Sequence, residues 1–133
     1  MNCILLVDDN PEDNFFHQRI INKTGLVSQL FVKDNPEAAL AFIKNEAAAM
    51  AECPGIILLD MHMPGMNGWE FVDAYTQVEH HIGCRGIVLM LQPTSNPKDR
   101  ERAANTPCII GTIEKPITAE SFTKLMERLN VPV

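Results

Sequence analysis

Four short apolar runs, separated by longer stretches of mixed composition, limit the folds that this chain can adopt. They occupy residues 3–7, 56–59, 87–91 and 108–110. Each run is continuously apolar, whereas a strand with one face in water alternates apolar and polar residues. Continuous runs of this length are typical of strands that helices cover on both faces. A fifth run, 29–32, alternates and is expected at the edge of the same sheet.

The segments between these runs carry apolar residues at helical spacing. In the last segment they recur at i, i+3, i+4 and i+7, as Phe122, Leu125, Met126 and Leu129. Two earlier segments have similar faces, formed by Ala39, Ile43, Ala47 and Met50, and by Phe71, Val72, Tyr75 and Val78. Strands that alternate with helices through short connections predict right-handed crossovers and a doubly wound, five-stranded parallel sheet.

Asparagine–proline pairs mark where several of these helices begin. An Asn side chain can accept a hydrogen bond from an unpaired N–H of the first turn, and a following proline has no N–H to leave unpaired. An acidic residue in the first turn interacts favourably with the helix dipole. The pairs are Asn10-Pro11, Asn35-Pro36 and Asn96-Pro97, followed by Glu12, Glu37 and Asp99, while Gly25 and Gly68 mark a helix end and a helix start.

The chain has 133 residues, enough for one domain with a substantial core, and shows no repeat or linker. We expect a single domain over 1–133 without an output domain, because the last helix ends near Leu129. No apolar run approaches the roughly 20 residues that cross a bilayer, and the N-terminus lacks the basic start of a signal peptide. The chain is therefore expected to be cytoplasmic, with no membrane partner.

Charge and cysteine content argue against further classes of protein. The net charge is −6 and no basic cluster is present, which argues against binding to a nucleic-acid backbone. The four cysteines stand far apart without a C-x-x-C pair, so a zinc site is not expected. A disulfide is not expected either. Cys3 and Cys108 lie in apolar runs and are predicted to be small, buried hydrophobic residues.

Acidic residues follow the expected strands at the edge where an open parallel sheet binds its ligands. Asp8 and Asp9 follow the first strand, Asp60 ends the third, and the fifth leads through Glu114 to Lys115. Each acidic position alone is often only a helix cap. Three carboxylates in one crevice repel one another unless a cation joins them, and a hard divalent ion suits such oxygen ligands. The pattern therefore predicts a magnesium site that faces a lysine.

Three stretches of the sequence resemble the receiver domain of bacterial response regulators. They are Leu5-Leu6-Val7-Asp8-Asp9-Asn10, the stretch from Leu58 to Gly68 that contains Asp60-Met61-His62-Met63-Pro64, and Lys115-Pro116. The resemblance covers essentially the whole chain, in order and at the family's spacing, and the D-x-x-M-P-x-x-x-G stretch is specific. It implies an α/β fold of the flavodoxin-like (βα)5 type with strand order 2-1-3-4-5.

By this resemblance, Asp60 is expected to accept a phosphoryl group. Asp9 and Asp60 match the family's direct Mg²⁺ ligands, with the backbone carbonyl of His62 as a third, and Asp8 would act through water. Lys115 would neutralise charge on the transferred group, and the peptide bond after it is expected to be cis. A histidine kinase or phosphotransfer protein would be the donor, and another protein the target. The domain would modify only itself, so no external turnover substrate is expected.

Two positions depart from the family pattern. Gln92 stands where a Thr or Ser normally follows the fourth strand, and Thr112 stands where an aromatic residue is usual, three residues before Lys115. In the family, the hydroxyl moves to bond the phosphoryl group and the aromatic ring fills the vacated space. Gln92 can still donate from its amide, but the usual pair is missing. His62 and Thr94 are expected to border the path of the water that hydrolyses the phosphate.

Three other functions fit parts of the pattern. A pseudo-receiver would keep the fold as an interaction module that needs no phosphate; Gln92 and Thr112 favour this function, and the intact acids and lysine weigh against it. An aspartyl-phosphate phosphatase usually shows D-x-D after the first strand, whereas the two acids here are adjacent. A flavin protein would need a Ser/Thr/Gly phosphate loop where Asp8 and Asp9 would repel the phosphate. The oligomeric state is not predicted.

Overall fold

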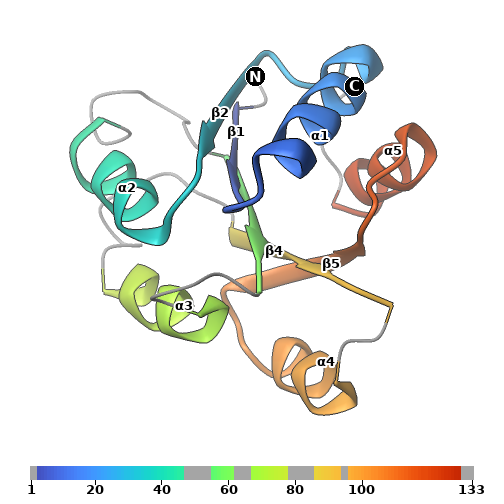
Figure 1. The fold of residues 1–133 in the computed structure, drawn as a ribbon. Helices are drawn as coiled ribbons and strands as arrows, with labels where there is room; N and C mark the ends of the chain where they lie inside the picture. Colours follow the sequence, from blue (N-terminus) through green and yellow to red (C-terminus); the bar gives the residue numbers. More distant parts are fainter. Residues whose placement is uncertain (1–2, 47–54, 62–66, 78–85, 94–95, 130–133) are drawn as a thin grey trace.

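Five parallel strands form one sheet in the order β2-β1-β3-β4-β5, which confirms the predicted doubly wound, flavodoxin-like fold (Figure 1). The computed structural model describes residues 3–46, 55–61, 67–77, 86–93 and 96–129. Its strands are β1 (Cys3–Val7), β2 (Gln29–Lys33), β3 (Ile56–Asp60), β4 (Gly86–Leu91) and β5 (Ile109–Glu114). Its α-helices are α1 (Pro11–Thr24), α2 (Pro36–Ala41), α3 (Gly68–Thr76), α4 (Pro97–Ala104) and α5 (Ala119–Arg128). None of the helices in these ranges has the length and apolar character needed to cross a membrane.

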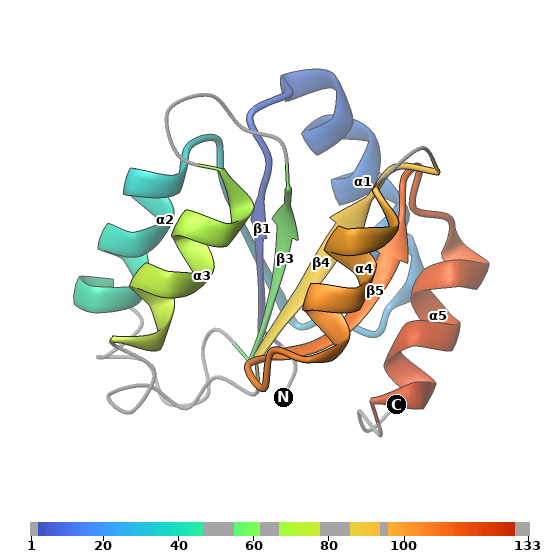
Figure 2. The ribbon, with the colours of Figure 1, turned by 90° about the horizontal axis from the view of Figure 1, so that it is seen from below.

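Helices cover both faces of the sheet, which explains why the central strands are continuously apolar. Helices α1 and α5 lie on one face, and α2, α3 and α4 lie on the other (Figures 1 and 2). Neighbouring strand residues point to opposite layers, so Leu5 joins the apolar layer that contains Phe71 and Leu6 joins the layer that contains Phe122. Every residue of β1, β3 and β4 is buried. The two apolar layers, one on each face of the sheet, therefore hold the carboxyl ends of these strands in place.

The two edge strands, β2 and β5, are less buried than the central strands. The alternating run 29–32 predicted an edge strand, and β2 lies at one edge of the sheet. The strand predicted over 108–110 is displaced and too short, because β5 runs from residue 109 to residue 114. Gly111 and Thr112 interrupt the apolar run there, and only Ile113 of this strand is buried. Apolar character is thus a poor guide to the length of a strand at a sheet edge.

The predicted caps are present at the starts of α1, α2 and α4. In α1, Asn10 Oδ1 accepts hydrogen bonds from the N–H groups of Glu12 and Asp13, at 2.9 and 3.1 Å. Gly25 ends the same helix in the left-handed conformation, with φ of 70°. Gly68 begins α3 after the cap Asn67, as predicted. Local chemistry therefore places the helix ends correctly.

The second helix differs from the prediction. It leaves the α-helical conformation after Ala41 and continues as a π-helical segment, η1 (Phe42–Glu46). Phe42 and Ile43 are both buried there, whereas the predicted face contained only Ile43. A π-helical turn contains more residues than an α-helical turn, so the α-helical period on which the prediction relied does not continue past Ala41. The other predicted face residues Ala47, Met50 and Val78 lie outside the described residues.

The expectation that the cysteines form no disulfide is wrong for Cys3. Cys3 is buried in β1 and is disulfide-bonded, whereas Cys108 is a half-buried free thiol. The prediction relied on an expected cytoplasmic location, where disulfides are uncommon, and on the wide spacing of the cysteines along the sequence. A disulfide requires only that two Cα atoms come within about 7 Å in space, and sequence spacing does not determine this in a crossover fold.

We predict that Gly68→Ala destabilises the protein by roughly 1–3 kcal/mol, because the new methyl group would overpack the junction of β3 and α3. A Cβ at this position would lie 2.6 Å from Met61 Sδ and 3.0 Å from Met61 Cα. The sulfur could move, but the backbone atom could not without displacing the end of β3. The free energy of unfolding in urea measures the effect.

Gly111→Ala is the matched control. Its Cβ would meet Leu125 Cδ1 at 3.5 Å, an ordinary contact, so we expect a change of about 1 kcal/mol or less. Equal destabilisation by the two substitutions would contradict the steric explanation.

Candidate functional site

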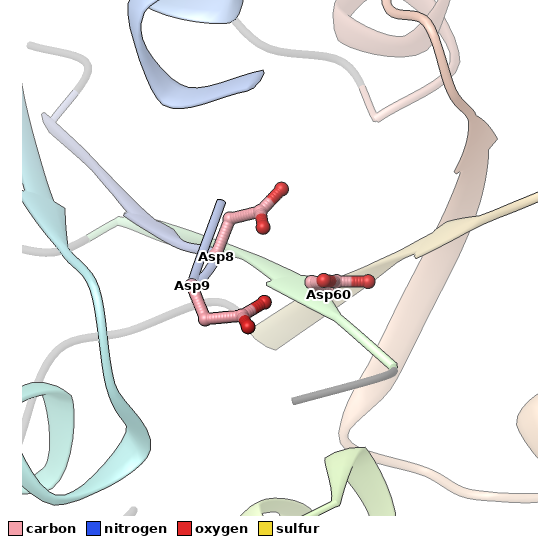
Figure 3. Close-up of side chains that lie close together, drawn as sticks. All are labelled: Asp8, Asp9 and Asp60. Carbon is pink, nitrogen blue, oxygen red and sulfur yellow. The ribbon is translucent and has the colours of Figure 1, made fainter. Parts of the chain in front are cut away.

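The carboxyl ends of β1 and β3 bring three carboxylates together, as the sequence predicts (Figure 3). The two strands are neighbours in the sheet; Asp8 directly follows β1 and Asp60 is the last residue of β3. One carboxylate oxygen from each of Asp8, Asp9 and Asp60 lies within 4.8 Å of the others. Asp8 and Asp60 are buried, whereas Asp9 is more accessible. We refer to these three residues as the acidic cluster.

Lys115 reaches the acidic cluster from the end of β5. Its Nζ lies 2.7 Å from Asp8 Oδ2, 3.1 Å from Asp13 Oδ2 and 3.5 Å from Asp60 Oδ2. The backbone N–H of Lys115 donates to the carbonyl of Leu91 at 2.8 Å, which ties this point of the chain to β4. The peptide bond after Lys115 is cis, as predicted. The ammonium therefore contacts Asp8 and Asp13 more closely than it contacts Asp60.

The sequence pattern did not identify Asp13 as part of this site. Asp13 lies in the first turn of α1, where the helix dipole alone favours an acidic residue. The presence of an aspartate at this position therefore did not indicate a role in the site. Its position was informative, because α1 starts directly after the acids at the end of β1 and its first turn must lie beside them.

Helix α1 is fastened to the site by two further polar side chains. Asn14 Nδ2 donates to the backbone carbonyl of Asp8 at 2.7 Å, in a buried position. His17 Nε2 accepts a hydrogen bond from the N–H of Ile117 at 3.2 Å, linking residues 100 positions apart in the sequence. Both side chains are buried. One face of α1 thus holds the end of β1 and the turn that follows Lys115.

The environment changes the pKa values of two of these groups. Burial of Lys115 acts to lower its pKa, but the hydrogen bond to Asp8 and the charge of Asp60 outweigh burial, so the pKa of the ammonium is raised. Burial lowers the pKa of His17, with a smaller opposing effect from Asp13. Lys115 is therefore charged at neutral pH, and the neutral imidazole of His17 is free to accept its hydrogen bond from the backbone.

Gln92 lies at the expected place, whereas Thr112 belongs to a different surface. A crevice of about 500 Å³ is lined by Asp9, Asn10, Pro11, Glu12, Asp13, Asp60, Gln92 and Lys115. Thr112 instead lines a groove of about 570 Å³ between β5 and α5. His62 and Thr94 lie outside the described residues, so their predicted roles stay predictions.

The chemistry of the acidic cluster fits a hard divalent cation. Carboxylate oxygens are the ligands that Mg²⁺ prefers, and it needs only one or two of them because it keeps several waters. Four acids, Asp9, Glu12, Asp13 and Asp60, line the crevice, with Asp8 buried beside them, and among the described residues Lys115 is the basic residue of the lining. This excess of negative charge favours a cation at the acidic cluster.

We predict that stability falls with acidic pH through His17. The pKa of His17 is lowered in the folded state, so folding excludes a proton that the unfolded chain binds near the usual histidine pKa of 6.5. The contribution of His17 to the free energy of unfolding is complete above pH 6.5. It is lost as the pH falls from 6.5 through the lower pKa of the folded state. The slope has a limit of about 1.4 kcal/mol per pH unit.

Urea unfolding of the wild type and His17→Gln between pH 7.5 and 5 measures this contribution. Gln can offer an uncharged acceptor to the N–H of Ile117, so the variant should lose less stability over that range. Identical pH dependence in both proteins would show that His17 is not the group responsible.

The sequence and the structure of this chain are similar to those of known regulatory proteins. The sequence profile of the response regulator receiver domain family matches residues 4–127. The chain is 24% identical over 126 residues to a probable methanogenesis regulatory protein, FilR2, of Methanothrix harundinacea, covering 95% of this chain and 79% of the relative. The crystal structure of a two-component response regulator from Cytophaga hutchinsonii has 29% identity and a TM-score of 0.81, covering 98% of each chain. A response regulator receiver protein from Dyadobacter fermentans has 24% identity and the same TM-score, covering 99% of this chain and 100% of that one, and shows likeness of fold.

Proposed function

This chain belongs to the response regulator receiver domain family, and on that premise we propose that it is a phosphoacceptor of a two-component phosphorelay, with Asp60 as the acceptor. The observation that carries the proposal is the convergence of Asp8, Asp9 and Asp60, with the Lys115 ammonium 2.7 Å from Asp8 and 3.5 Å from Asp60. Phosphoryl transfer requires positioning and neutralisation of charge, and these residues can supply both.

Three of these residues would hold Mg²⁺. Asp9 and Asp60 are proposed as direct ligands and Asp8 as a ligand through water, and the acidic cluster supports this assignment. The backbone carbonyl of His62 is proposed as a further ligand on the basis of family resemblance. When bound, the ion would neutralise charge on the phosphoryl oxygens and orient the group toward Asp60.

In the proposed step, a carboxylate oxygen of Asp60 attacks the phosphorus of a phosphohistidine on the donor protein. The P–N bond breaks as the P–O bond forms, and the departing imidazole keeps the electron pair and takes a proton from water. The Lys115 ammonium neutralises charge on the phosphoryl oxygens, and the amide of Gln92, which lines the crevice, can donate to one of them. Water later hydrolyses the acyl phosphate, which restores Asp60 and releases inorganic phosphate.

The receiver family implies two-component signalling rather than turnover of an external substrate. We propose a histidine kinase or phosphotransfer protein as donor and a downstream protein as target. The domain would then act by changing its contacts with that target, and its only chemistry would be its own phosphorylation and dephosphorylation. The cytoplasmic location and the single-domain organisation over 1–133 stay predictions.

A phosphorylation-independent interaction module is the second candidate. Thr112 and Gln92 favour it, because Thr112 is too small to replace the family's aromatic residue and Gln92 is not the small hydroxyl residue usual at its position. The groove beside Thr112 is consistent with the absence of a large side chain on β5. The intact acidic cluster and its lysine argue for the phosphoacceptor, since a module that needs no phosphate has no use for four converging charges.

Incubation with acetyl phosphate and Mg²⁺ tests the proposed function. Intact mass should show one added phosphoryl group on the wild type and none on Asp60→Asn, because the amide is no nucleophile. Removal of Mg²⁺ with a chelator should also prevent the modification. Asp73→Asn, an exposed acid of α3 outside the crevice, is the control and should be modified like the wild type. Phosphate uptake by Asp60→Asn would refute the assignment.

We also predict that a phosphoryl group changes the surface formed by α4, β5 and α5 only weakly. Thr112 is too small to fill vacated space as an aromatic ring does, and Pro93 restricts the backbone at Gln92. Amide NMR spectra with and without beryllofluoride, a phosphoryl mimic, should show changes concentrated at the crevice. Large changes throughout α4, β5 and α5 would show that another mechanism couples the two regions.

A further inference from the structure

Asp13 lines the crevice and contacts Lys115, yet the proposed function gives it no role. It is neither the acceptor nor a member of the acidic cluster. Its Oδ2 nevertheless lies 3.1 Å from Lys115 Nζ and accepts a hydrogen bond from it. The Asp13 side chain is 41% exposed, so water could solvate its carboxylate without the contact to Lys115. The contact therefore needs another explanation.

The position of Asp13 relative to Lys115 is well determined. Asn14 and His17 lie on the same side of α1, and they bond the backbone of Asp8 and Ile117, respectively. These two bonds attach α1 to the segment that carries Asp8 and to the segment that carries Lys115 itself. The first turn is additionally fixed by its cap, because the N–H of Asp13 donates to Asn10 Oδ1. Asp13 is thus presented to Lys115 by a helix that cannot easily shift.

The geometry of an ammonium group connects this contact to the chemistry. An ammonium has three N–H donors in fixed relative directions. Asp8 at 2.7 Å and Asp13 at 3.1 Å are within hydrogen-bonding distance, whereas Asp60 Oδ2 at 3.5 Å is at the limit of a hydrogen bond. The hydrogen bond to Asp13 and the ion pair with Asp8 restrict the directions of the N–H groups, and Asp60 is the next nearest carboxylate for a remaining donor.

We propose that Asp13 is a positioning residue, which together with Asp8 orients the Lys115 ammonium so that its third N–H points to the place of the incoming phosphoryl oxygen. The inference rests on the proposed function. Without Asp13 the ammonium keeps its charge and its contact with Asp8, but it can rotate and swing away from the crevice. Pre-organised donors cost no reorganisation during transfer, so loss of orientation slows the reaction.

Rates of phosphorylation by acetyl phosphate at saturating Mg²⁺ test the effect on chemistry. Asp13→Ala should be slower than the wild type by roughly two- to fivefold, the range expected for a half-exposed ion pair. Asp13→Asn keeps a neutral acceptor and should lie between the two, while Asp13→Glu keeps the charge and should recover most of the rate. Glu12→Gln is the matched control, since it removes one negative charge from the same helical turn and the same crevice.

A second measurement needs neither metal nor phosphate. In metal-free protein, the ¹⁵N-labelled ammonium of Lys115 should give a slowly exchanging NMR signal, because bonds to Asp8 and Asp13 protect it from water. The signal should weaken or vanish in Asp13→Ala and persist in Glu12→Gln. Assignment by loss of the signal in Lys115→Arg completes the test.

The two measurements separate this inference from the proposed function. If the wild type takes up no phosphoryl group, the proposed function is refuted. The NMR signal of the Lys115 ammonium still reports whether the contact with Asp13 is formed. An Asp13→Ala protein that reacts as fast as the wild type, or faster, overturns the inference. So does a rate equal to that of Glu12→Gln, because the effect would then come from net charge alone. Absence of the protected signal in the wild type overturns it as well.

Discussion

The ion pair between Lys115 and Asp8 is the contact on which the arrangement of the site depends. Asp8 is fully buried, and an unpaired buried carboxylate costs several kcal/mol. The ammonium at 2.7 Å offsets that cost. Asp8 follows β1 and Lys115 follows β5, and β3 and β4 lie between these two strands in the sheet. The ion pair therefore connects the ends of β1 and β5 across the carboxyl ends of β3 and β4. Asp60, at the end of β3, lies beside this pair, with its Oδ2 3.5 Å from Lys115 Nζ, and experiences the charge of the ammonium.

Regular features of this fold could be predicted because each depends on local chemistry. Continuous apolar runs identify buried strands, and strand ends identify Asp60 and Lys115. Residues whose roles depend on contacts between distant segments could not be identified in this way. Asp13 looks like any acid in a first helical turn, and His17 bonds the backbone of a residue 100 positions away. The disulfide of Cys3 depends in the same way on proximity in space rather than in sequence.

Polar contacts rather than apolar packing hold much of α4 to the rest of the molecule. Among the residues that the structure describes, Ala103 is the buried residue of this helix. Trp69 Nε1, on α3, donates to Asp99 Oδ1 at 3.1 Å, and the guanidinium carbon of Arg102 lies 4.2 Å from the centre of the Trp69 ring. An aromatic ring that both donates a hydrogen bond and stacks with a cation attaches α4 to α3 without burying the helix.

On its other side, α4 is connected to the crevice by charge. Arg100 Nη2 lies 3.1 Å from Glu114 Oε1 and 3.4 Å from the carbonyl of Gln92. Glu114 precedes Lys115, and Gln92 lines the crevice, so this arginine contacts two segments that border the crevice. The route replaces aromatic packing, for which Thr112 is too small, with an exposed ion pair. Such a pair contributes about 1 kcal/mol or less and is screened by salt. Coupling between the crevice and α4 along this route is therefore limited by the strength of one surface ion pair.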